Sequence, residues 1–444
     1  MKETKRQKTY YTETYGCQMN EHDSEKISWI LENMDYIKTD SAEKADFIIY
    51  NTCAIRENAE LKVYGKIGAL KKLKGLNPDL MIAICGCMMQ REDVRKIITT
   101  KHKHVDIIFG THNIHKLPQL INSHLKSGET IVDILEDTRE IVEHIDVNRT
   151  YSYKAYINIM YGCNNFCTYC VVPYTRGREL SRTPENILRE VEGLAKEGCK
   201  EVTLLGQNVN SYGKTLDYDY NFSNLLEDIN KIDGIERIRF MTSHPKDLSK
   251  DLIKSYATLD KLAEHLHLPI QSGSNKILKE MNRNYTRESY IEIIKELRKA
   301  VPNIGLSTDI IVGFPGETEE DFNATLELIK EIRFDSAYTF LYSVREGTKA
   351  AKMENQVDYK VKHERFQRLS DALNEISLEE NQKLIGQTLD VLVEEVSKNN
   401  PEVLTGRTRT YKLVHFKGNE DLIGSIVNIK IEKTTTFTLE GTLI

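Results

Sequence analysis

Short apolar runs alternate with longer amphipathic segments along the first part of the chain. The runs have the length and composition of buried strands, and the segments between them carry apolar residues at helical spacing. This alternation predicts an open parallel sheet with helices on its faces, in a domain spanning residues 8–125. A polar, histidine-rich stretch (111–128) and an acidic one (133–147) are expected to act as a connector. The predicted strands are KTYYTET (8–14), DFIIYN (46–51), MIAICG (81–86) and VDIIFG (105–110).

A second alternating series begins near residue 153. Helical patterns follow most of its strand-like runs, and a long helix is expected at 363–385. Six strand–helix units predict an open, partial (β/α)6 barrel over residues 149–382, smaller than the eight-unit barrel. The predicted strands are AYINIMY (155–161), EVTLLG (201–206), ERIRFM (236–241), EHLHLPI (264–270), LSTDIIVGF (306–314) and DSAYTFLY (335–342).

The pattern changes again in the last segment, residues 383–444. LDVLVEEV, LTGRTRTYKLVHF, SIVNIKIEKTT and FTLEGTLI alternate apolar and polar positions and are rich in Val, Ile and Thr. Such segments predict a small all-β barrel. The chain as a whole is therefore expected to combine two α/β domains with one all-β domain.

Composition narrows the possible functions. A net charge of −6 over 444 residues excludes a generally basic nucleic-acid coat, so any RNA contact must be local. The longest apolar runs fall far short of the ~20 residues of a membrane span. Eight cysteines are too sparse for a secreted disulfide scaffold. We therefore expect a cytoplasmic protein, in which clustered cysteines are metal ligands or catalytic groups.

Three cysteines follow the first predicted barrel strand as C-x3-C-x2-C. This second cysteine group comprises Cys163, Cys167 and Cys170. Thiolates at such spacing can bind one soft metal centre. A [4Fe–4S] cluster with one open iron is the leading interpretation, because structural zinc takes four ligands and the loop offers three. Zinc and unligated core cysteines are the alternatives.

This loop, placed after the first strand of a six-unit barrel, resembles the radical S-adenosylmethionine (SAM) enzymes. The resemblance implies that the amino and carboxylate groups of SAM chelate the open iron. One-electron reduction then cleaves SAM to methionine and a 5′-deoxyadenosyl radical, while the protein positions the reactants and excludes water. The family places an aromatic residue, here Tyr169, near the adenine of SAM; a packed loop aromatic is the alternative.

A first cysteine group lies in the N-terminal domain and comprises Cys17, Cys53 and Cys87. Each follows a predicted strand, and the carboxyl ends of parallel strands share one edge of a sheet, where ligands bind. We therefore expect the three thiolates to converge into another three-ligand site. Three unrelated buried cysteines are the alternative. The two remaining cysteines, Cys85 and Cys199, are expected to be structural.

The whole arrangement resembles the methylthiotransferase family of radical SAM enzymes, whose C-terminal β-barrel is called TRAM. The resemblance implies a radical-generating [4Fe–4S] cluster on the second cysteine group and an auxiliary [4Fe–4S] cluster on the first, which carries the incoming sulfur. One SAM donates the methyl group and another supplies the radical. The stretches CTYCVVPYTRGRELSR, LLGQNVNSYG, RIRFMTSHP, LHLPIQSGS and DIIVGFPGET are similar to the branch that modifies C2 of N6-(dimethylallyl)adenosine at tRNA position 37. Threonylcarbamoyladenosine in tRNA and an aspartate of a ribosomal protein are alternative substrates.

Polar residues just past the barrel strands are candidates for binding SAM, because such positions build the site of a βα barrel. These candidates are Gln207, Ser243, Gln271, Asp309, Gly313 and Ser343, with Tyr169 from the cysteine loop. The same reasoning nominates Asn208, His244, Ser272, Glu317, Tyr342 and Arg345.

Basic residues near the second cysteine group and in the last domain are candidates for binding RNA. They are Arg176, Arg178, Arg182, Arg407, Arg409, Lys412 and the aromatic Phe416. A salt-bridged loop is the alternative for the first three. The expected partners are a tRNA anticodon arm, an electron-donor protein and a sulfur source, with no membrane, and the chain is expected to act as a monomer. A non-catalytic iron–sulfur RNA-binding sensor is the competing hypothesis from another class.

Overall fold

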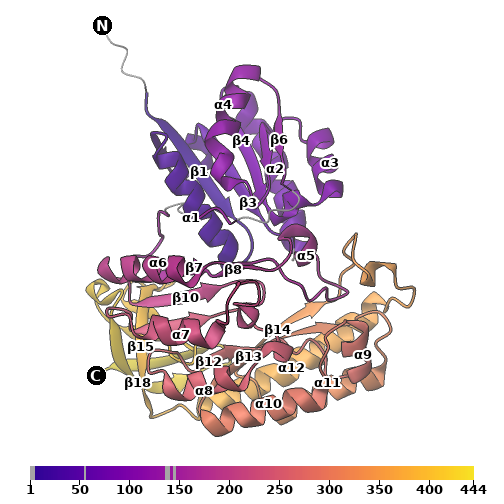
Figure 1. Ribbon diagram of the computed structural model, residues 1–444, viewed down its shortest axis with the longest axis vertical. Helices are drawn as coiled ribbons and strands as arrows, with labels where there is room; N and C mark the ends of the chain where they lie inside the picture. Colours follow the sequence, from indigo (N-terminus) through magenta and orange to yellow (C-terminus); the bar gives the residue numbers. More distant parts are fainter. Residues whose placement is uncertain (1–5, 55–56, 136–140, 144–146) are drawn as a thin grey trace. The chain divides into compact units, whose positions relative to one another are not determined.

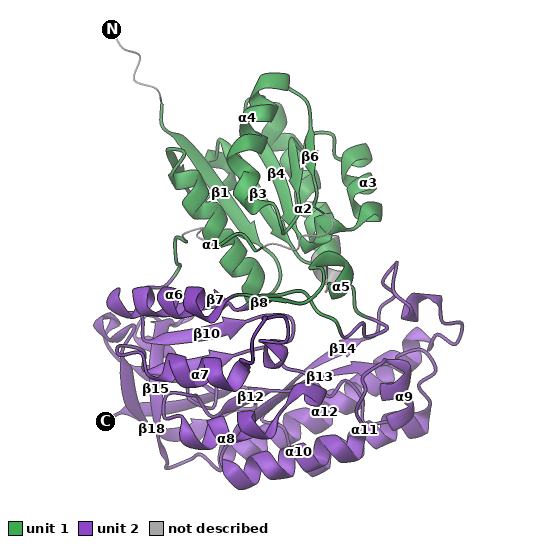
Figure 2. Cartoon of the chain, viewed as in Figure 1, with its two compact units in different colours: residues 1–150, 160–164, 170–182 green, residues 151–159, 165–169, 183–444 purple. Residues whose placement is uncertain are grey.

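The computed structural model describes residues 6–54, 57–135, 141–143 and 147–444. The chain divides into two compact units (Figure 2). The first unit holds residues 1–150, 160–164 and 170–182, and the second holds 151–159, 165–169 and 183–444. The second cysteine group is therefore divided, with Cys163 and Cys170 in the first unit and Cys167 in the second.

The first unit contains a parallel sheet in the order β2-β1-β3-β4-β5-β6 (Figure 1). Four of these strands lie where the sequence predicts them. The short edge strands β2 and β6 are additional, because a three-residue edge strand leaves no readable alternation. The strands are β1 (Lys8–Thr14), β2 (Tyr36–Lys38), β3 (Phe47–Thr52), β4 (Met81–Gly86), β5 (Ile107–Phe109) and β6 (Ile131–Asp133).

The expected connector over 111–128 is wrong. Helix α4 (Leu117–Ser127) occupies most of it and buries Leu117, Leu120 and Ile121 against the sheet. Three apolar positions were enough for a packed helix, although its other positions are mostly polar. Of the acidic stretch 133–147, residues 136–140 and 144–146 lie outside the described residues.

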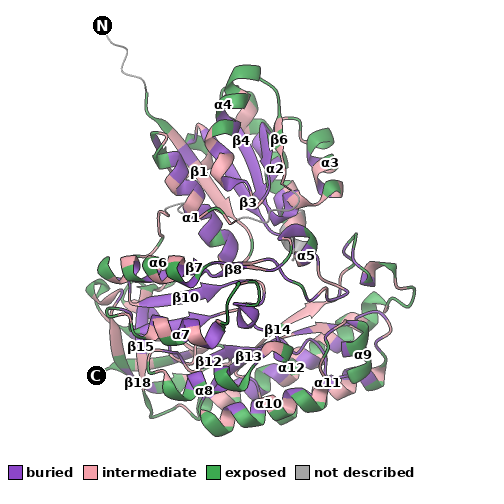
Figure 3. Cartoon of the chain, viewed as in Figure 1, coloured by how far each residue is buried: buried purple, intermediate pink, exposed green. Residues whose placement is uncertain are grey.

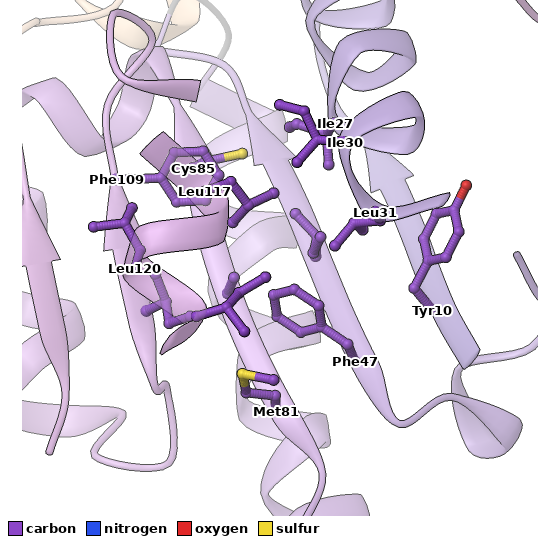
Figure 4. Close-up of a cluster of buried hydrophobic side chains, with 14 of the residues drawn as sticks. Tyr10, Ile27, Ile30, Leu31, Phe47, Met81, Cys85, Phe109, Leu117 and Leu120 are labelled. Atoms are coloured by element: carbon purple, nitrogen blue, oxygen red, sulfur yellow. The ribbon is translucent and has the colours of Figure 1, made fainter. Parts of the chain in front are cut away.

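Helices cover both faces of this sheet, because successive strand residues point to opposite sides. On one face Phe47 packs with residues of α1 (Gln18–Glu32) and α4, and on the other Ile48 packs with α2 (Glu57–Leu76) and α3 (Glu92–Lys101). Strands β3 and β4 are buried along their whole length (Figure 3). Cys85 lies in the first of these cores beside Phe109 (Figure 4), which confirms its structural role.

The second unit contains the partial barrel. Strands β11-β10-β7 and β12-β13-β14 form two parallel three-stranded sheets, and an isolated bridge pairs Ile238 of β11 with Leu262, three residues before β12. All six predicted strands are present: β7 (Lys154–Asn158), β10 (Glu201–Leu205), β11 (Arg237–Phe240), β12 (His265–His267), β13 (Gly305–Val312) and β14 (Ser336–Leu341). The connecting helices are α6 (Pro184–Lys196), α7 (Phe222–Asn230), α8 (Lys250–Thr258), α9 (Asn275–Glu280), α10 (Arg287–Ala300) and α11 (Glu319–Ile332).

The long helix predicted after the barrel is α12 (Tyr359–Gln382). It leads into a closed five-stranded barrel in the order β15-β16-β17-β19-β18, as predicted for the last domain. The strands are β15 (Thr388–Val396), β16 (Val403–Thr408), β17 (Leu413–Lys417), β18 (Ile426–Thr434) and β19 (Thr438–Leu443). The predicted fold class, two α/β parts and one small β-barrel, is confirmed.

The chain between β7 and α6 carries the second cysteine group. In the first unit, β8 (Met160–Tyr161) pairs with β9 (Leu180–Ser181), and the short helix α5 (Val172–Thr175) lies between them in sequence. Within the described part of the chain, no helix has the length and apolarity needed to cross a membrane.

Candidate functional site

The first cysteine group lies at the carboxyl ends of three neighbouring strands. Cys53 and Cys87 directly follow β3 and β4, and Cys17 follows β1 by three residues and precedes the first turn of α1. Strand register brings these ends level, since Thr14 pairs with Asn51 and Thr52 pairs with Gly86. The convergence predicted from the strand pattern is therefore present.

The thiols of this group are close enough to influence one another. Burial raises the pKa of the Cys87 thiol to about 12; Arg176 opposes this shift, and the thiols of Cys53 and Cys17 add to it. A Cβ atom at Gly16 would lie 2.9 Å from the Cβ of Cys53, and Gly16 has a φ of +136°. Glycine at this position therefore lets the Cys17 turn approach Cys53 closely.

An asparagine ties the cysteine-bearing turns together. Asn20 is fully buried; its Nδ2 donates to Asn51 Oδ1 (3.1 Å) and to the carbonyl of Thr52 (3.0 Å). Its Oδ1 accepts from the Cys17 thiol at 3.6 Å. Asn51 Nδ2 in turn donates to the Asn20 carbonyl at 2.8 Å. The network fixes the positions from which Cys17 and Cys53 project.

An arginine from the segment that follows Cys170 contacts the first cysteine group. Arg176 Nε donates to Cys87 Sγ at 3.0 Å, and its Nη2 donates to Asp23 Oδ2 at 2.9 Å. Nη2 also lies 3.3 Å from Asn20 Oδ1. The Arg176 side chain is 4% exposed, so these contacts are made out of water.

The second cysteine group is supported by the loop that follows α9. Thr168 N donates to the Met281 carbonyl at 3.1 Å, and Asn282 Nδ2 donates to the carbonyls of Asn165 (3.0 Å) and Phe166 (3.1 Å). Arg283 Nη1 lies 3.5 Å from Cys167 Sγ. Its Nε donates to Tyr285 Oη at 2.7 Å and its Nη2 to the Pro269 carbonyl at 2.8 Å.

The donor set of the first group fits an iron–sulfur cluster in number and chemistry. Among the described residues, no three histidine, cysteine or carboxylate side chains converge tightly enough to hold one metal ion. In a cubane cluster each thiolate ligates a different iron, so three ligands are spaced more widely than around zinc. Three cysteines at the ends of neighbouring strands therefore match the ligand number of a cubane cluster with one open iron.

Residues past the barrel strands form a continuous series of contacts. His244, after β11, bonds through its backbone to Asn210, after β10, and its ring lies 5.5 Å from that of Tyr285. Gln271 N donates to the Asp309 carbonyl at 2.8 Å. Gln271 has a φ of +71°, a strained conformation for a residue with a side chain.

Polar atoms in this region remain available to a ligand. Ser243 Oγ, His244 Nε2 and Asn208 Oδ1 are buried and have no hydrogen-bond partner among the described residues. Burial lowers the pKa of His244 to about 2, so the ring is neutral. Because His244 Nδ1 accepts from Lys246 N at 3.3 Å, Nε2 carries the proton and is a donor. Orphaned polar atoms at the strand ends fit a small polar ligand such as SAM.

The other SAM candidates are Tyr169 and Gly313, near Phe314, and Gln207 and Ser343, past other strands. The Tyr169 ring lies 6.5 Å from that of Phe314, edge to face, and both belong to one apolar cluster. Gly313, with a φ of +72°, donates its N–H to Glu317 Oε1 at 3.0 Å. Arg365 Nη1 donates to the same oxygen at 2.9 Å. Gln207 is half-buried past β10 and Ser343 half-buried past β14.

The RNA candidates near the second cysteine group separate into two kinds. Arg176 and Arg182 are buried, and Arg182 Nη2 pairs with Glu143 Oε2 at 2.8 Å. Arg178 is exposed and lines a small pocket of the first unit with Lys26 and His115. Of these three arginines, only Arg178 presents its side chain to solvent.

Two of the C-terminal RNA candidates form ion pairs with the central barrel. Arg409 Nε pairs with Glu264 at 2.5 Å, and Lys412 Nζ pairs with Asp335 at 2.7 Å. The Arg407 guanidinium lies over the Tyr411 ring at 4.4 Å. Phe416 is 2% exposed in the core of the β-barrel, so its interpretation as a stacking platform for bases is corrected. An alternating strand pattern does not reveal which face is inward until the barrel closes.

Three contacting residues were missed by sequence reasoning. Asn20 and Asp23 lie on α1 and Arg283 follows α9, outside any cysteine motif. Only the proximity of Asn20 and Asp23 to Cys17, at three and six residues, was readable in advance. Arg283 is 116 residues from Cys167 and left no local signal.

Comparison with known proteins agrees with this geometry. Residues 157–329 match the radical SAM superfamily, residues 382–444 match the TRAM domain, and residues 9–110 match a family described only as uncharacterized. The tRNA-2-methylthio-N(6)-dimethylallyladenosine synthase of Alkaliphilus oremlandii is 60% identical over 98% of this chain and 93% of its own length. The synthase of the same name from Clostridioides difficile is 56% identical over 99% and 92%.

Solved structures support the fold. The radical SAM methyltransferase TsrM from Kitasatospora setae has a TM-score of 0.55 at 12% identity, over 78% of this chain and 75% of its own. The near full-length relatives and the radical SAM match show that the chain is a member of the tRNA-2-methylthio-N(6)-dimethylallyladenosine synthase family of radical SAM enzymes.

Proposed function

We propose that this protein adds a methylthio group to C2 of N6-(dimethylallyl)adenosine at tRNA position 37. The product is 2-methylthio-N6-(dimethylallyl)adenosine. The observation that carries the proposal is the presence of two three-cysteine groups in one chain whose near full-length relatives bear this activity in their names. The three-cysteine pattern with an open position and the polar strand ends favour the enzyme over a non-catalytic iron–sulfur sensor.

The cysteine groups would hold two [4Fe–4S] clusters, which supply one-electron chemistry on SAM and a site for the transferred sulfur. Cys163, Cys167 and Cys170 would hold the radical-generating cluster, and Cys17, Cys53 and Cys87 the auxiliary one. The chain's own task is positioning. His244 Nε2 and Ser243 Oγ offer buried hydrogen bonds to SAM, and Tyr169, packed on the buried Phe314, offers an aromatic ring to its adenine. The remaining residues proposed to hold SAM are Gln207, Gln271, Asp309, Gly313 and Ser343.

The tRNA anticodon arm is the proposed macromolecular substrate, and its target base must leave the stack to be modified. Arg178 is the proposed phosphate contact, supported by its exposure and by Lys26 in the same pocket. We further propose that the chain acts as a cytoplasmic monomer. An electron-donor protein and a sulfur source complete the reaction, because the chain itself supplies neither.

Nucleoside mass spectrometry of tRNA tests the substrate. Deletion of the gene should abolish 2-methylthio-N6-(dimethylallyl)adenosine and accumulate the unmodified N6-(dimethylallyl)adenosine. Loss of the methylthio group only from threonylcarbamoyladenosine, or only from a ribosomal-protein aspartate, would overturn the proposal.

Reconstituted variants test the division of labour between the cysteine groups. Cys163→Ala should abolish formation of 5′-deoxyadenosine from SAM. Cys87→Ala should retain 5′-deoxyadenosine formation but yield no methylthiolated tRNA. Cys199→Ala, which removes a buried cysteine outside both groups, is the matched control and should retain both activities. SAM cleavage by Cys163→Ala would refute the radical assignment.

A further inference from the structure

We propose that Arg176 is a positioning residue of the first cysteine group, which holds Cys87 in place and sets the reduction potential of the cluster bound there. This inference rests on the proposed function only in taking the first group as a cluster site. It replaces the interpretation of Arg176 as an RNA contact, which its burial contradicts.

The contacts of Arg176 are directed at the cysteine site. Nε, which has a single proton, points at Cys87 Sγ over 3.0 Å. Nη2 contacts Asp23 Oδ2 at 2.9 Å and Asn20 Oδ1 at 3.3 Å. Since Asn20 Oδ1 also accepts from Cys17 at 3.6 Å, one guanidinium is linked to two of the three cysteines. A phosphate contact needs a solvent-facing fork, which this geometry lacks.

The electrostatic partner of Arg176 is already present in the fold. The side chains of Arg176 and Asp23 are both 4% exposed, and a buried charge of either sign is costly without the other. The pair is therefore neutral as a unit. Its arginine end faces Cys87 and its carboxylate end lies on α1. A cluster at this site would meet the hydrogen-bonding end of the pair.

Arg176 also lies close in sequence to the second cysteine group. Arg176 follows α5, and its N–H donates to the Val172 carbonyl at 2.8 Å. Cys170 of the second cysteine group lies six residues earlier in the same unit. Val171, between them, packs with Cys87 and Ala54. One short stretch therefore carries a proposed ligand of one cluster and the hydrogen-bond donor to the ligand of the other.

The direction of the effect follows from charge. A hydrogen bond to a cluster thiolate stabilises the more negative, reduced state and raises the reduction potential. Removing Arg176 deletes this bond and leaves the Asp23 carboxylate unneutralised nearby, so both changes lower the potential. Removing the charge of Asp23 alone has the opposite sign.

An EPR-monitored redox titration of the first cluster tests the proposal. The full-length protein carrying Cys163→Ala, Cys167→Ala and Cys170→Ala is reconstituted anaerobically, so that only the first group can bind a cluster. In this background Arg176→Gln should shift the potential negative, Asp23→Asn should shift it positive, and Arg176→Lys should give a smaller negative shift than Arg176→Gln. Iron and sulfide content of about four each per chain confirms loading.

Arg178→Gln is the matched control, because Arg178 lies two residues away and is exposed. It should leave the potential unchanged and weaken binding of an anticodon stem-loop, whereas Arg176→Gln should leave that affinity unchanged. An unchanged potential in loaded Arg176→Gln, or a loss of RNA affinity matching Arg178→Gln, would overturn the proposal. If Arg176→Gln fails to load, Asp23→Asn decides: a positive shift supports the proposal and no shift rejects it. The titration uses neither SAM nor tRNA, so an incorrect substrate assignment would not alter it.

Discussion

The two cysteine groups are each met by one buried arginine, but the two arginines differ in charge balance. Arg176 contacts Cys87 and is paired with the buried carboxylate of Asp23. Arg283 contacts Cys167, and its other bonds go to a carbonyl and a phenol hydroxyl. No ion pair to Arg283 is present in the part of the chain that the structure describes.

This difference indicates how the two sites handle electrons. A neutralised arginine supplies mainly a directed hydrogen bond, whereas an unneutralised buried arginine requires a negative partner. At the second group the proposed negative partner of Arg283 is the cluster bound through Cys167. The folded chain thus leaves positive charge at the group proposed to accept the electron for SAM cleavage, and little at the other.

The largest effect is expected from Arg283→Met. It removes a charge-assisted hydrogen bond worth about 1.5–3 kcal/mol, so 5′-deoxyadenosine formation at limiting reductant should fall about 10- to 100-fold. The potential of the second cluster should also shift negative, because a positive charge and a hydrogen bond to Cys167 are lost. Arg287→Met, which alters a surface pair with Glu327, is the control. An unchanged potential in Arg283→Met would remove the proposed role of this arginine.

A smaller contrast is expected between the asparagines that support the two groups. Asn20→Ala removes two buried hydrogen bonds, to Asn51 and Thr52, and should lower the unfolding free energy by about 2–3 kcal/mol. Asn282→Ala, at a half-buried site, should cost about 1 kcal/mol, and part of this reflects its φ of +59°. Urea denaturation of the metal-free protein followed by circular dichroism measures both. A larger loss for Asn282→Ala would contradict the burial argument.

The smallest expected effect is a pH dependence of stability that arises from Glu317 in the central barrel. Burial raises the pKa of Glu317 from 4.5 to about 7, against the opposing Gly313 N–H and Arg365. The folded state then binds the proton more tightly than the unfolded state, so this contribution is complete below about pH 4.5 and is lost as pH rises through 7. The slope is at most about 1.4 kcal/mol per pH unit. Glu317→Gln should flatten the stability profile between pH 5 and 7; an unaltered slope would exclude Glu317 as its source.

The hydrophobic pattern of the strands and the spacing of the cysteines predicted most of the fold and the two cysteine groups. Hydrophobic runs located β3, β4 and all six barrel strands, because buried parallel strands are continuous apolar segments. The convergence of Cys17, Cys53 and Cys87 was predicted because each cysteine follows a parallel strand, and the carboxyl ends of such strands share one edge. The hydrophobic pattern did not predict three elements, β2, β6 and α4. Their sequences are short or mostly polar and are stabilised by tertiary packing.

The basic residues were the least predictable feature. The sequence does not distinguish Arg176, Arg178 and Arg182 from one another, yet two of them are buried and one is exposed. Their carboxylate partners, Asp23 and Glu143, lie 153 and 39 residues away. Ion pairing at such separations depends on the fold and leaves no trace in local sequence spacing.

Buried arginines also determine how the C-terminal β-barrel behaves as a module. Arg237 and Arg239, on β11, donate to the carbonyls of Arg407 and Arg409, and Arg237 is fully buried. Deletion of the last 62 residues (383–444) would remove these carbonyl acceptors and leave Glu201 as the carboxylate partner of both guanidinium groups. Exchange of this module between relatives, in evolution or in engineering, therefore requires matching these inter-domain contacts.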